Sequence, residues 1–194
     1  MNPTSRNLLN FVAFQLAWFA CVLGGAHDRV AAGTLAVAAV VALHLAIAPQ
    51  PGPEARLVAI VTAIGLAWDS LIVSLGLMSY PAGMFSPGVA PVWILAMWAL
   101  FATTLNLSMG WLKGRPWLAV AFGAVGGPLA YLAGKKLGGV EMSEPALALL
   151  AQGLGWAVMM PLLLRLAARL NGFETRRAPS PRANTYLPGP PRAA

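Results

Sequence analysis

The chain has 194 residues, of which 58% are hydrophobic and only 10% are charged. Because soluble domains carry about 25% charged residues, this composition excludes an ordinary soluble globule. The formal charge of +7 is distributed between apolar runs and in the C-terminal segment, where membrane proteins place the Lys and Arg that set topology. We therefore expect no nucleic-acid binding. The single cysteine, Cys21, excludes an intramolecular disulfide and a cysteine-based metal cluster.

Six apolar runs predict the fold class, which is all-α, a polytopic transmembrane bundle of six helices. An α-helix needs about 20 residues to cross a hydrocarbon core about 30 Å thick, and the runs have about this length. They are residues 8–24, 30–48, 57–79, 92–112, 117–137 and 146–170. The first run has the layout of a signal peptide, but its length and its polar residues Asn10 and Gln15 favour a retained helix.

The second run contains a histidine, His44, near its end. An intramembrane histidine can relay protons or bind a ligand, although a hydrogen bond to a neighbouring helix also explains it. Residues 49–54 follow with three prolines, and we predict a turn there because proline removes backbone donors and fixes the chain.

The third run carries Asp69 close to its middle, and this carboxyl group is the strongest functional lead in the chain. A charged side chain at that depth costs roughly 2.5–3.5 kcal/mol on insertion scales, so we expect it to face other helices. Helical spacing places a small and polar face on one side, comprising Thr62, Gly65, Asp69 and Gly76. The opposite side should face lipid, and it comprises Ile60, Ile64, Leu71 and Met78.

The last three runs add further polar and small residues. The fourth ends in a group of polar side chains that includes Asn106. The fifth has a stripe of small residues, Ala119, Gly123 and Gly127, typical of close helix packing. Gln152 lies in the sixth run, and residues 171–194 are rich in Arg and Pro, which predicts a disordered cytoplasmic tail attracted to anionic lipid headgroups.

Cation counting predicts the topology. If all six runs span, ten Lys and Arg residues lie on the side of the N-terminus and three on the other side. The positive-inside rule then places both termini in the cytoplasm. Helix direction predicts a cytoplasm-facing polar pocket closed at mid-membrane by Asp69, without a metal or cofactor. Its candidate residues are Asp69, Ser70, Gln15, Asn10, His44, Asn106 and Gln152.

Several motifs resemble one family. They are Asn10-Phe11 with Gln15 and Trp18, Trp68-Asp69-Ser70, the segment from Pro91-Val92-Trp93 to Trp111 with Thr104-Leu105-Asn106, and Gly126-Gly127-Pro128 with Tyr131 and Gly134. Together they resemble the bacterial DUF2878 family over most of residues 7–139. The resemblance implies a small proteobacterial inner-membrane protein of a family without an assigned activity. It also implies that a histidine is frequent where this chain has Leu107.

Three function classes remain open at this point. The first is a non-catalytic accessory or scaffold protein, with a lipid-related role among the options and membrane lipids, a second copy or a membrane protein as partners. The second is a small proton-coupled carrier in which Asp69 is the protonatable group. The third is a lipid-modifying enzyme, for which the chain offers neither HExxH nor GxSxG. The first class requires the fewest assumptions and is our leading hypothesis.

Overall fold

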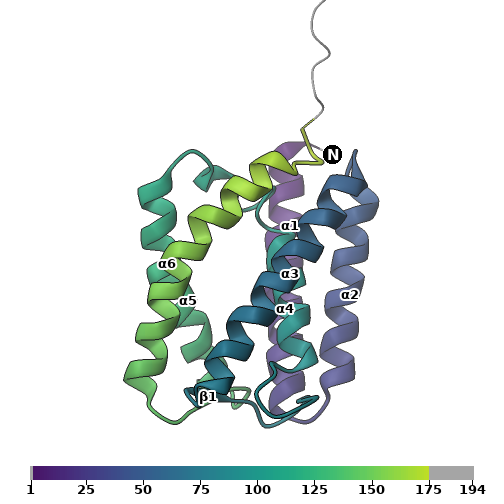
Figure 1. Cartoon of the computed structure of the whole chain (residues 1–194). Helices are drawn as coiled ribbons and strands as arrows, with labels where there is room; N and C mark the ends of the chain where they lie inside the picture. The colour runs from purple at the N-terminus through teal and green to yellow at the C-terminus, as the bar shows by residue number, and fades with distance from the viewer. Residues whose placement is uncertain (1, 175–194) are drawn as a thin grey trace, which may run out of the picture.

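The computed structural model describes residues 2–174, and these residues form six α-helices and one two-stranded sheet (Figure 1). The helices are α1 (Pro3–Ala26), α2 (Val30–Ile47), α3 (Pro51–Ser74), α4 (Val92–Ala102), α5 (Pro116–Lys136) and α6 (Pro145–Arg169). A 3₁₀ turn, η1, covers Gly110–Leu112, and the strands are β1 (Met78–Ser79) and β2 (Glu141–Met142). The predicted disordered tail lies outside the described residues from residue 175 onwards.

Five of the helices, α1, α2, α3, α5 and α6, are long and apolar enough to cross a membrane. Many large apolar side chains point outwards from them, for example Leu16 at 68% exposure and Leu35 at 69%. Such a surface is costly in water and suits acyl chains. The architecture is therefore that of a multi-pass membrane protein.

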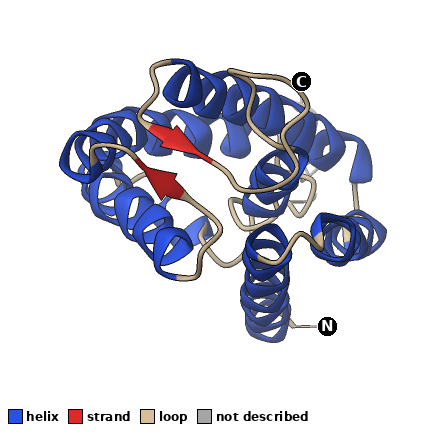
Figure 2. Cartoon of the chain, turned by 90° about the horizontal axis from the view of Figure 1, so that it is seen from below, coloured by secondary structure: helices blue, strands red, loops and turns tan. Residues whose placement is uncertain are grey.

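The bundle consists of two groups of helices. Helices α1 to α4 pack on one another, whereas α5 and α6 pack mainly against each other and meet the first group through α3 and α6 (Figure 1). Both ends of the described chain lie at the same end of the bundle (Figure 1). At the other end β1 and β2 pair antiparallel, with Met78 opposite Met142, and so connect the two groups (Figure 2).

The start of α3 differs from the predicted turn at residues 49–54. Pro51 occupies the first helical turn, and the helix runs from there instead of from residue 57. Proline is tolerated in this turn because the first N–H groups of a helix have no partner within it. The earlier start places Glu54 on the inner face of α3, fully buried.

The fourth predicted helix, residues 92–112, is shorter than expected, since α4 ends at Ala102. The hydroxyl groups of Thr103 and Thr104 donate to the carbonyl oxygens of Leu100 and Phe101 over 2.7 Å. Such local bonds compete with the helical pattern, and the chain continues through tight turns to η1. With 11 residues, α4 is about 16 Å long, roughly half of a hydrocarbon core.

Glycine packing follows the prediction for the fifth helix. Ala119, Gly123 and Gly127 are buried, and a Cβ atom at Gly123 would collide with the backbone oxygen of Trp156 in α6. The face predicted for α3 is confirmed in part, because Gly65 and Asp69 are buried and Ile60 and Leu71 are exposed.

The prediction of the α3 faces was wrong for two residues, Gly76 and Met78, because both lie beyond the end of the helix. The helix ends at Ser74, where Gly76 at φ +69° turns the chain towards β1. Met78, predicted to face lipid, consequently lies in β1 and is only 2% exposed.

Candidate functional site

Asp69 lies five residues before the end of α3, in the half of the bundle that holds β1 and β2, and joins three helices. Its side chain on α3 is 0% exposed. The indole N–H of Trp98 on α4 donates to Oδ2 over 2.6 Å, and the hydroxyl of Tyr131 on α5 donates to Oδ1 over 2.6 Å. Both carboxylate oxygens therefore have a donor, and the two helix groups are linked through one side chain.

A second hydrogen-bonded pair lies in the same part of the bundle and involves Gln152 on α6. Its Oε1 accepts from the indole N–H of Trp68 on α3 over 2.8 Å, and its Nε2 lies 3.7 Å from the sulfur of Met78. Gln152 is fully buried. Since α5 and α6 make few other contacts with α3, this pair is a further link between the two groups.

Tyr80, in the loop after β1, completes this region. Its hydroxyl group is buried and makes no hydrogen bond to another described residue. Burial, and then the nearby negative charge of Asp69, raise the pKa of Tyr80 well above its usual value of 10. The tyrosine therefore remains a neutral donor next to the carboxyl group. We name Asp69, Trp98, Tyr131, Gln152 and Tyr80 the central cluster.

Glycines allow the tryptophans of this region to lie close to the helices. A Cβ atom at Gly65 would collide with the ring of Trp98, and one at Gly127 with the ring of Trp156. The rings of Trp98 and Trp156 are stacked, with centroids 4.8 Å apart and planes 9° apart. Small residues thus determine where the indole that donates to Asp69 can lie.

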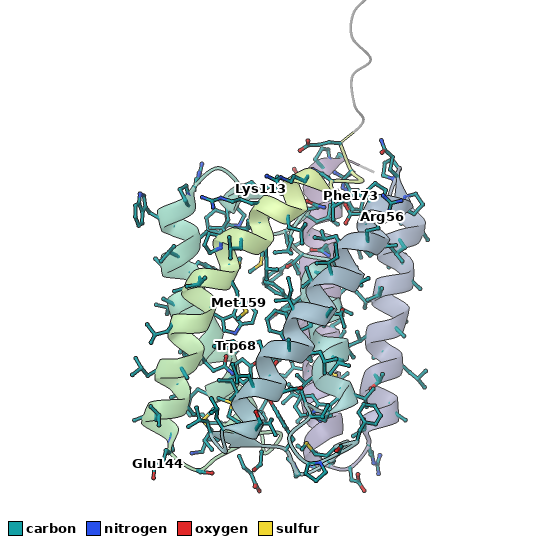
Figure 3. The ribbon with its side chains drawn as sticks, in the orientation of Figure 1. Arg56, Trp68, Lys113, Glu144, Met159 and Phe173 are labelled. Atoms are coloured by element: carbon teal, nitrogen blue, oxygen red, sulfur yellow. The ribbon has the colours of Figure 1, made fainter. Side chains whose placement is uncertain are left out.

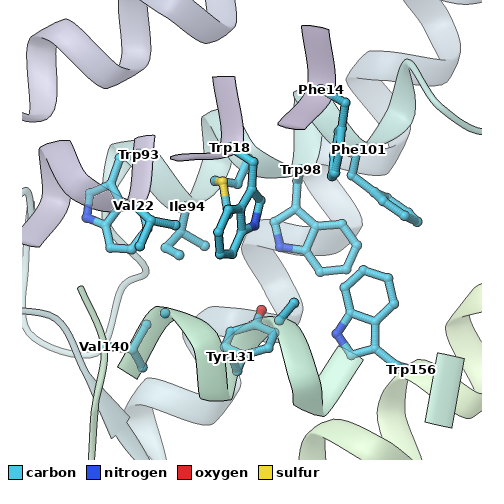
Figure 4. A pocket seen from close by; sticks show the side chains of 13 residues that line it. Phe14, Trp18, Val22, Trp93, Ile94, Trp98, Phe101, Tyr131, Val140 and Trp156 are labelled. Atoms are coloured by element: carbon cyan, nitrogen blue, oxygen red, sulfur yellow. The ribbon is translucent and has the colours of Figure 1, made fainter. Parts of the chain in front are cut away.

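An aromatic-lined cavity of about 100 Å³ borders the central cluster (Figure 4). Trp98 and Tyr131, the two donors to Asp69, form part of its wall, and the other lining residues come from α1, α4, α5 and α6 and from Val140. The cavity therefore lies between the two helix groups.

A second buried carboxyl group, Glu54, lies near the end of the bundle where the termini meet. Its Oε2 is 2.9 Å from Nε2 of His44 on α2, and its Oε1 accepts from the Asn106 side chain and from the main-chain N–H of Gly172, both over 2.7 Å. Lys113 in turn donates to the amide oxygen of Asn106. We name Glu54, His44, Asn106 and Gly172 the terminal cluster.

The terminal cluster holds the segment that follows α6. Gly172 accepts a main-chain hydrogen bond from Gln50 over 3.0 Å, and a Cβ atom at Gly172 would collide with the Gln50 carbonyl oxygen. The Phe173 ring lies edge-on to the His44 ring, with centroids 5.2 Å apart, and the Arg6 guanidinium lies over it at 4.7 Å. Phe173 itself lies at the end of the bundle that carries the described termini (Figure 3). Residues 171–174 were predicted to belong to the disordered tail. Residues 172 and 173 instead pack on the bundle, because the Glu54 carboxylate accepts a hydrogen bond from the main-chain N–H of Gly172.

Asn10 belongs to a third group of hydrogen bonds. Its Oδ1 accepts from the hydroxyl of Ser108 over 2.6 Å, and its Nδ2 donates to the carbonyl oxygen of Thr103 over 3.1 Å. These bonds connect α1 to the turns that follow α4. Asn10 is 6% exposed, as expected for a polar side chain that faces the bundle.

Hydrogen bonds therefore divide the predicted site residues among several places. Asp69 and Gln152 lie in the central cluster, and His44 and Asn106 lie in the terminal cluster. Ser70 accepts from the main-chain N–H of Ala90 over 3.1 Å in the loop before α4. Gln15 is partly buried and makes no side-chain hydrogen bond to another residue between 2 and 174. The single polar pocket that we predicted is thus replaced by separate clusters.

Sequence reasoning missed Glu54, Trp98 and Tyr131. Glu54 was interpreted as part of a turn because it follows three prolines, although a carboxylate four positions after Gln50 and next to an apolar run is also typical of a first helical turn. Trp98 and Tyr131 occur in the motifs that carry the family resemblance, but the pairing of either with Asp69 depends on helix order. No spacing rule within one helix predicts such a contact.

Comparison with known proteins provides one match. Comparisons with the curated proteins and with the solved structures found none. The family model described as "Protein of unknown function (DUF2878)" matches residues 7–162. This range covers most of the chain, from the start of α1 into α6, and includes the whole central cluster. The chain belongs to the DUF2878 family.

Proposed function

We propose that the protein is a non-catalytic accessory protein of the bacterial inner membrane, whose rigid bundle serves as a scaffold in contact with lipid and with a membrane partner. One observation carries this proposal. Both oxygens of Asp69 are occupied by donors of α4 and α5, and the donors are the neutral side chains of Trp98 and Tyr131. A buried carboxyl group with a donor at each oxygen favours one arrangement of the helices that supply the donors.

We further propose that the chain crosses the membrane six times, with both termini in the cytoplasm. Residues 92–112 supply the sixth crossing as a short helix followed by tight turns that lead to Lys113. The end of the bundle that carries the described termini holds Arg56 and Lys113, and the opposite end holds Glu144 (Figure 3). Alkaline phosphatase fusions at residue 29 and after residue 194 test this topology, because only the first should be active.

A proton-coupled carrier is the second candidate, and the full burial of the Asp69 carboxyl group on a helix that is apolar enough to cross a membrane favours it. A carrier must expose its proton site to each side of the membrane in turn, whereas the two bonds to Asp69 favour one state. The observation therefore supports the scaffold more directly.

One experiment separates the two candidates. The full chain and the Asp69→Asn variant are reconstituted in vesicles that contain a pH-sensitive dye, and proton flux is measured after an imposed pH difference. The scaffold proposal expects equal, background flux for both proteins, together with a lower unfolding free energy for the variant. Flux above background that Asp69→Asn abolishes would establish the carrier instead. A Ser86→Ala variant, altered in an exposed loop, controls for reconstitution efficiency.

A further inference from the structure

Another cavity lies between the start of α5 and the last turns of α6, and its volume is about 170 Å³. The two helices touch where Gly123 meets the backbone of Trp156. From there they diverge towards the end of the bundle that carries the described termini (Figure 1). The loop before α5 lines the remaining side, because Gly114 at φ +76° turns the chain into Pro116 at the start of this helix. We name this space the basic cavity.

Positive charge distinguishes the lining of the basic cavity. Of the ten described residues that line it, three are cationic and none is acidic. Lys113 and Arg115 come from the loop before α5, and Arg165 comes from α6. The other lining residues are apolar, and they are Leu112, Gly114, Pro116, Ala119, Pro161, Leu164 and Ala168. Walls of one charge sign with a low-dielectric lining concentrate ions of the opposite sign, so the cavity should attract an anion.

The described chain does not neutralise these cations. The ion pair found among residues 2–174 is that of His44 and Glu54, and it involves neither guanidinium of the cavity. Lys113 donates to the amide oxygen of Asn106, which carries no charge. Burial lowers the pKa of Lys113 from its usual 10.5, although the negative charges of Glu174 and Glu54 act in the opposite direction. These carboxylates therefore compensate the ammonium group only in part.

The basic cavity has room for a phosphate group. A cavity needs about 10–15 Å³ to hold one water molecule, and a phosphorus atom with its oxygens takes the place of a few waters. The volume of about 170 Å³ is several times larger than that. Guanidinium groups match phosphate oxygens with pairs of parallel hydrogen bonds, and lysine binds phosphate as a point charge. The lining therefore has the chemistry of a phosphate site.

The level of the basic cavity in the bundle indicates a lipid phosphate. Trp117, in the first turn of α5, is 84% exposed, and tryptophan is enriched at the level of lipid headgroups. Exposed apolar side chains continue from this level towards the middle of the bundle, namely Leu118 and Phe122 on α5 and Val158 and Leu162 on α6. A phospholipid can therefore place its phosphate in the cavity and keep its acyl chains in the hydrocarbon region.

We propose that the basic cavity binds the phosphate group of an anionic phospholipid, with the acyl chains along the exposed faces of α5 and α6. Basic pockets between transmembrane helices bind anionic headgroups in this way. A net negative charge on the lipid is needed, because the same three cations repel the ammonium group of a zwitterionic lipid. The assignment goes beyond the scaffold function, since it supplies a ligand and a site, and it holds equally for a carrier.

The unfolding temperature tests the site, because a ligand that binds the folded state raises it. The full chain is heated in dodecyl maltoside micelles, alone and with dioleoyl phosphatidylglycerol or dioleoyl phosphatidylcholine at equal concentration, and tryptophan fluorescence reports unfolding. Phosphatidylglycerol should raise the unfolding temperature by about 3 °C or more, and phosphatidylcholine by less than about 1 °C. Equal shifts would overturn the preference for an anionic lipid.

Two pairs of variants separate the cavity from general charge attraction. Arg165→Gln removes a cation of the cavity, whereas Arg56→Gln removes an exposed cation at the same end of the bundle (Figure 3). Ala168→Phe fills the cavity, whereas Ala121→Phe alters an exposed alanine outside its lining, and both keep every cation of the chain.

Each lipid shift is measured relative to the same variant without lipid. Arg165→Gln and Ala168→Phe should reduce the phosphatidylglycerol shift about threefold or more, and both controls should retain it. Because Arg165 is exposed, its replacement tests the site even where Ala168→Phe lowers the unfolding temperature without lipid. Equal reductions in a cavity variant and its control would assign the shift to general charge attraction and overturn the site.

A soluble phosphate ester identifies the source of the phosphate. Glycerol 3-phosphate carries a phosphate group without acyl chains. At about tenfold molar excess over the lipid concentration it should raise the unfolding temperature by less than about 1 °C. A shift as large as that of phosphatidylglycerol, and lost in Arg165→Gln, would assign the cavity to a soluble phosphate ester and overturn the lipid.

Discussion

Helix α3 carries two fully buried carboxyl groups, and their surroundings differ. Asp69 and Glu54 are both 0% exposed, and they are 15 positions apart on α3, which corresponds to about 22 Å along its axis. Asp69 lies five residues before the end of α3 and accepts from two aromatic side chains, one from each helix group. Glu54 accepts from a side-chain amide and a main-chain N–H, and contacts a histidine, close to the end of the bundle.

The comparison teaches that the same chemical group serves two structural purposes. Asp69 joins α3 to a donor from each helix group, so it determines how the two helix groups fit together. Near the end water can enter once a side chain is removed, and Glu54 instead organises a loop segment that would otherwise have unpaired backbone groups. The free-energy cost of deletion should therefore be larger for Asp69, although Glu54 has more partners.

The largest effect is expected for Asp69→Ala. This variant leaves the indole N–H of Trp98 and the hydroxyl of Tyr131 without an acceptor, at about 1–3 kcal/mol for each. We therefore expect the unfolding free energy, measured by SDS titration in mixed micelles, to fall by about 2–6 kcal/mol. Asp69→Asn, which keeps one acceptor oxygen, should cost about half as much. A loss below about 0.5 kcal/mol would place Asp69 outside the stabilising network.

A smaller effect is expected for Glu54→Ala, about 1–3 kcal/mol, because water can reach the freed donors. Its specific consequence should be local. Limited proteolysis should cut after Leu170 or Phe173 several times faster than in the unaltered protein, since Gly172 loses its acceptor. Glu54→Gln, which keeps an oxygen for Gly172, serves as the matched control. Unchanged cleavage would separate Glu54 from the docking of this segment.

Two tyrosines of the central cluster provide a matched pair. Tyr131→Phe removes a donor to Asp69 and should lower the unfolding free energy by about 1–2 kcal/mol. Tyr80→Phe removes a hydroxyl group without a partner and should change it by less than about 0.5 kcal/mol. Equal losses in the same SDS titration would contradict the hydrogen-bond assignment.

The smallest effect concerns alkaline pH. The pKa of Tyr80 is raised in the folded state above its usual value of 10, so above pH 10 the unfolded state binds fewer protons than the folded state. Stability contributed by Tyr80 is therefore present below pH 10 and is lost as pH rises, by about 1 kcal/mol between pH 10 and 11. The unfolding free energy of Tyr80→Phe should fall correspondingly less over this range, and an equal fall in both proteins would contradict the raised pKa.

Sequence alone identified Asp69 because a carboxylate within an apolar run contrasts with its neighbours. Hydropathy likewise indicated the long helices, since their length and composition match the membrane. Glu54 gave no such contrast beside Pro51 and Pro53, and the end of α4 depended on hydrogen bonds from Thr103 and Thr104 that compete with the helix. Local propensity cannot decide such a competition, because tertiary contacts contribute to its outcome.

Contacts between helices were beyond prediction for a related reason. Periodicity shows which face of a helix is buried, but it does not show which helix covers that face. The partners of Asp69 are 29 and 62 residues away along the chain, and His44 and Asn106 meet only because both reach Glu54. The predicted depth of each polar residue in the membrane therefore could not by itself show which residues form a cluster.

A double-mutant cycle between Asp69→Ala and Tyr131→Phe tests most directly whether one carboxyl group joins the two helix groups, because each substitution removes the hydrogen bond between the two side chains. The unfolding free energies of the unaltered protein, both single variants and the double variant are measured by SDS titration under one condition. Because the two side chains share a hydrogen bond of 2.6 Å, we predict a coupling energy of about 1–2 kcal/mol. Effects that add within about 0.5 kcal/mol would contradict the account.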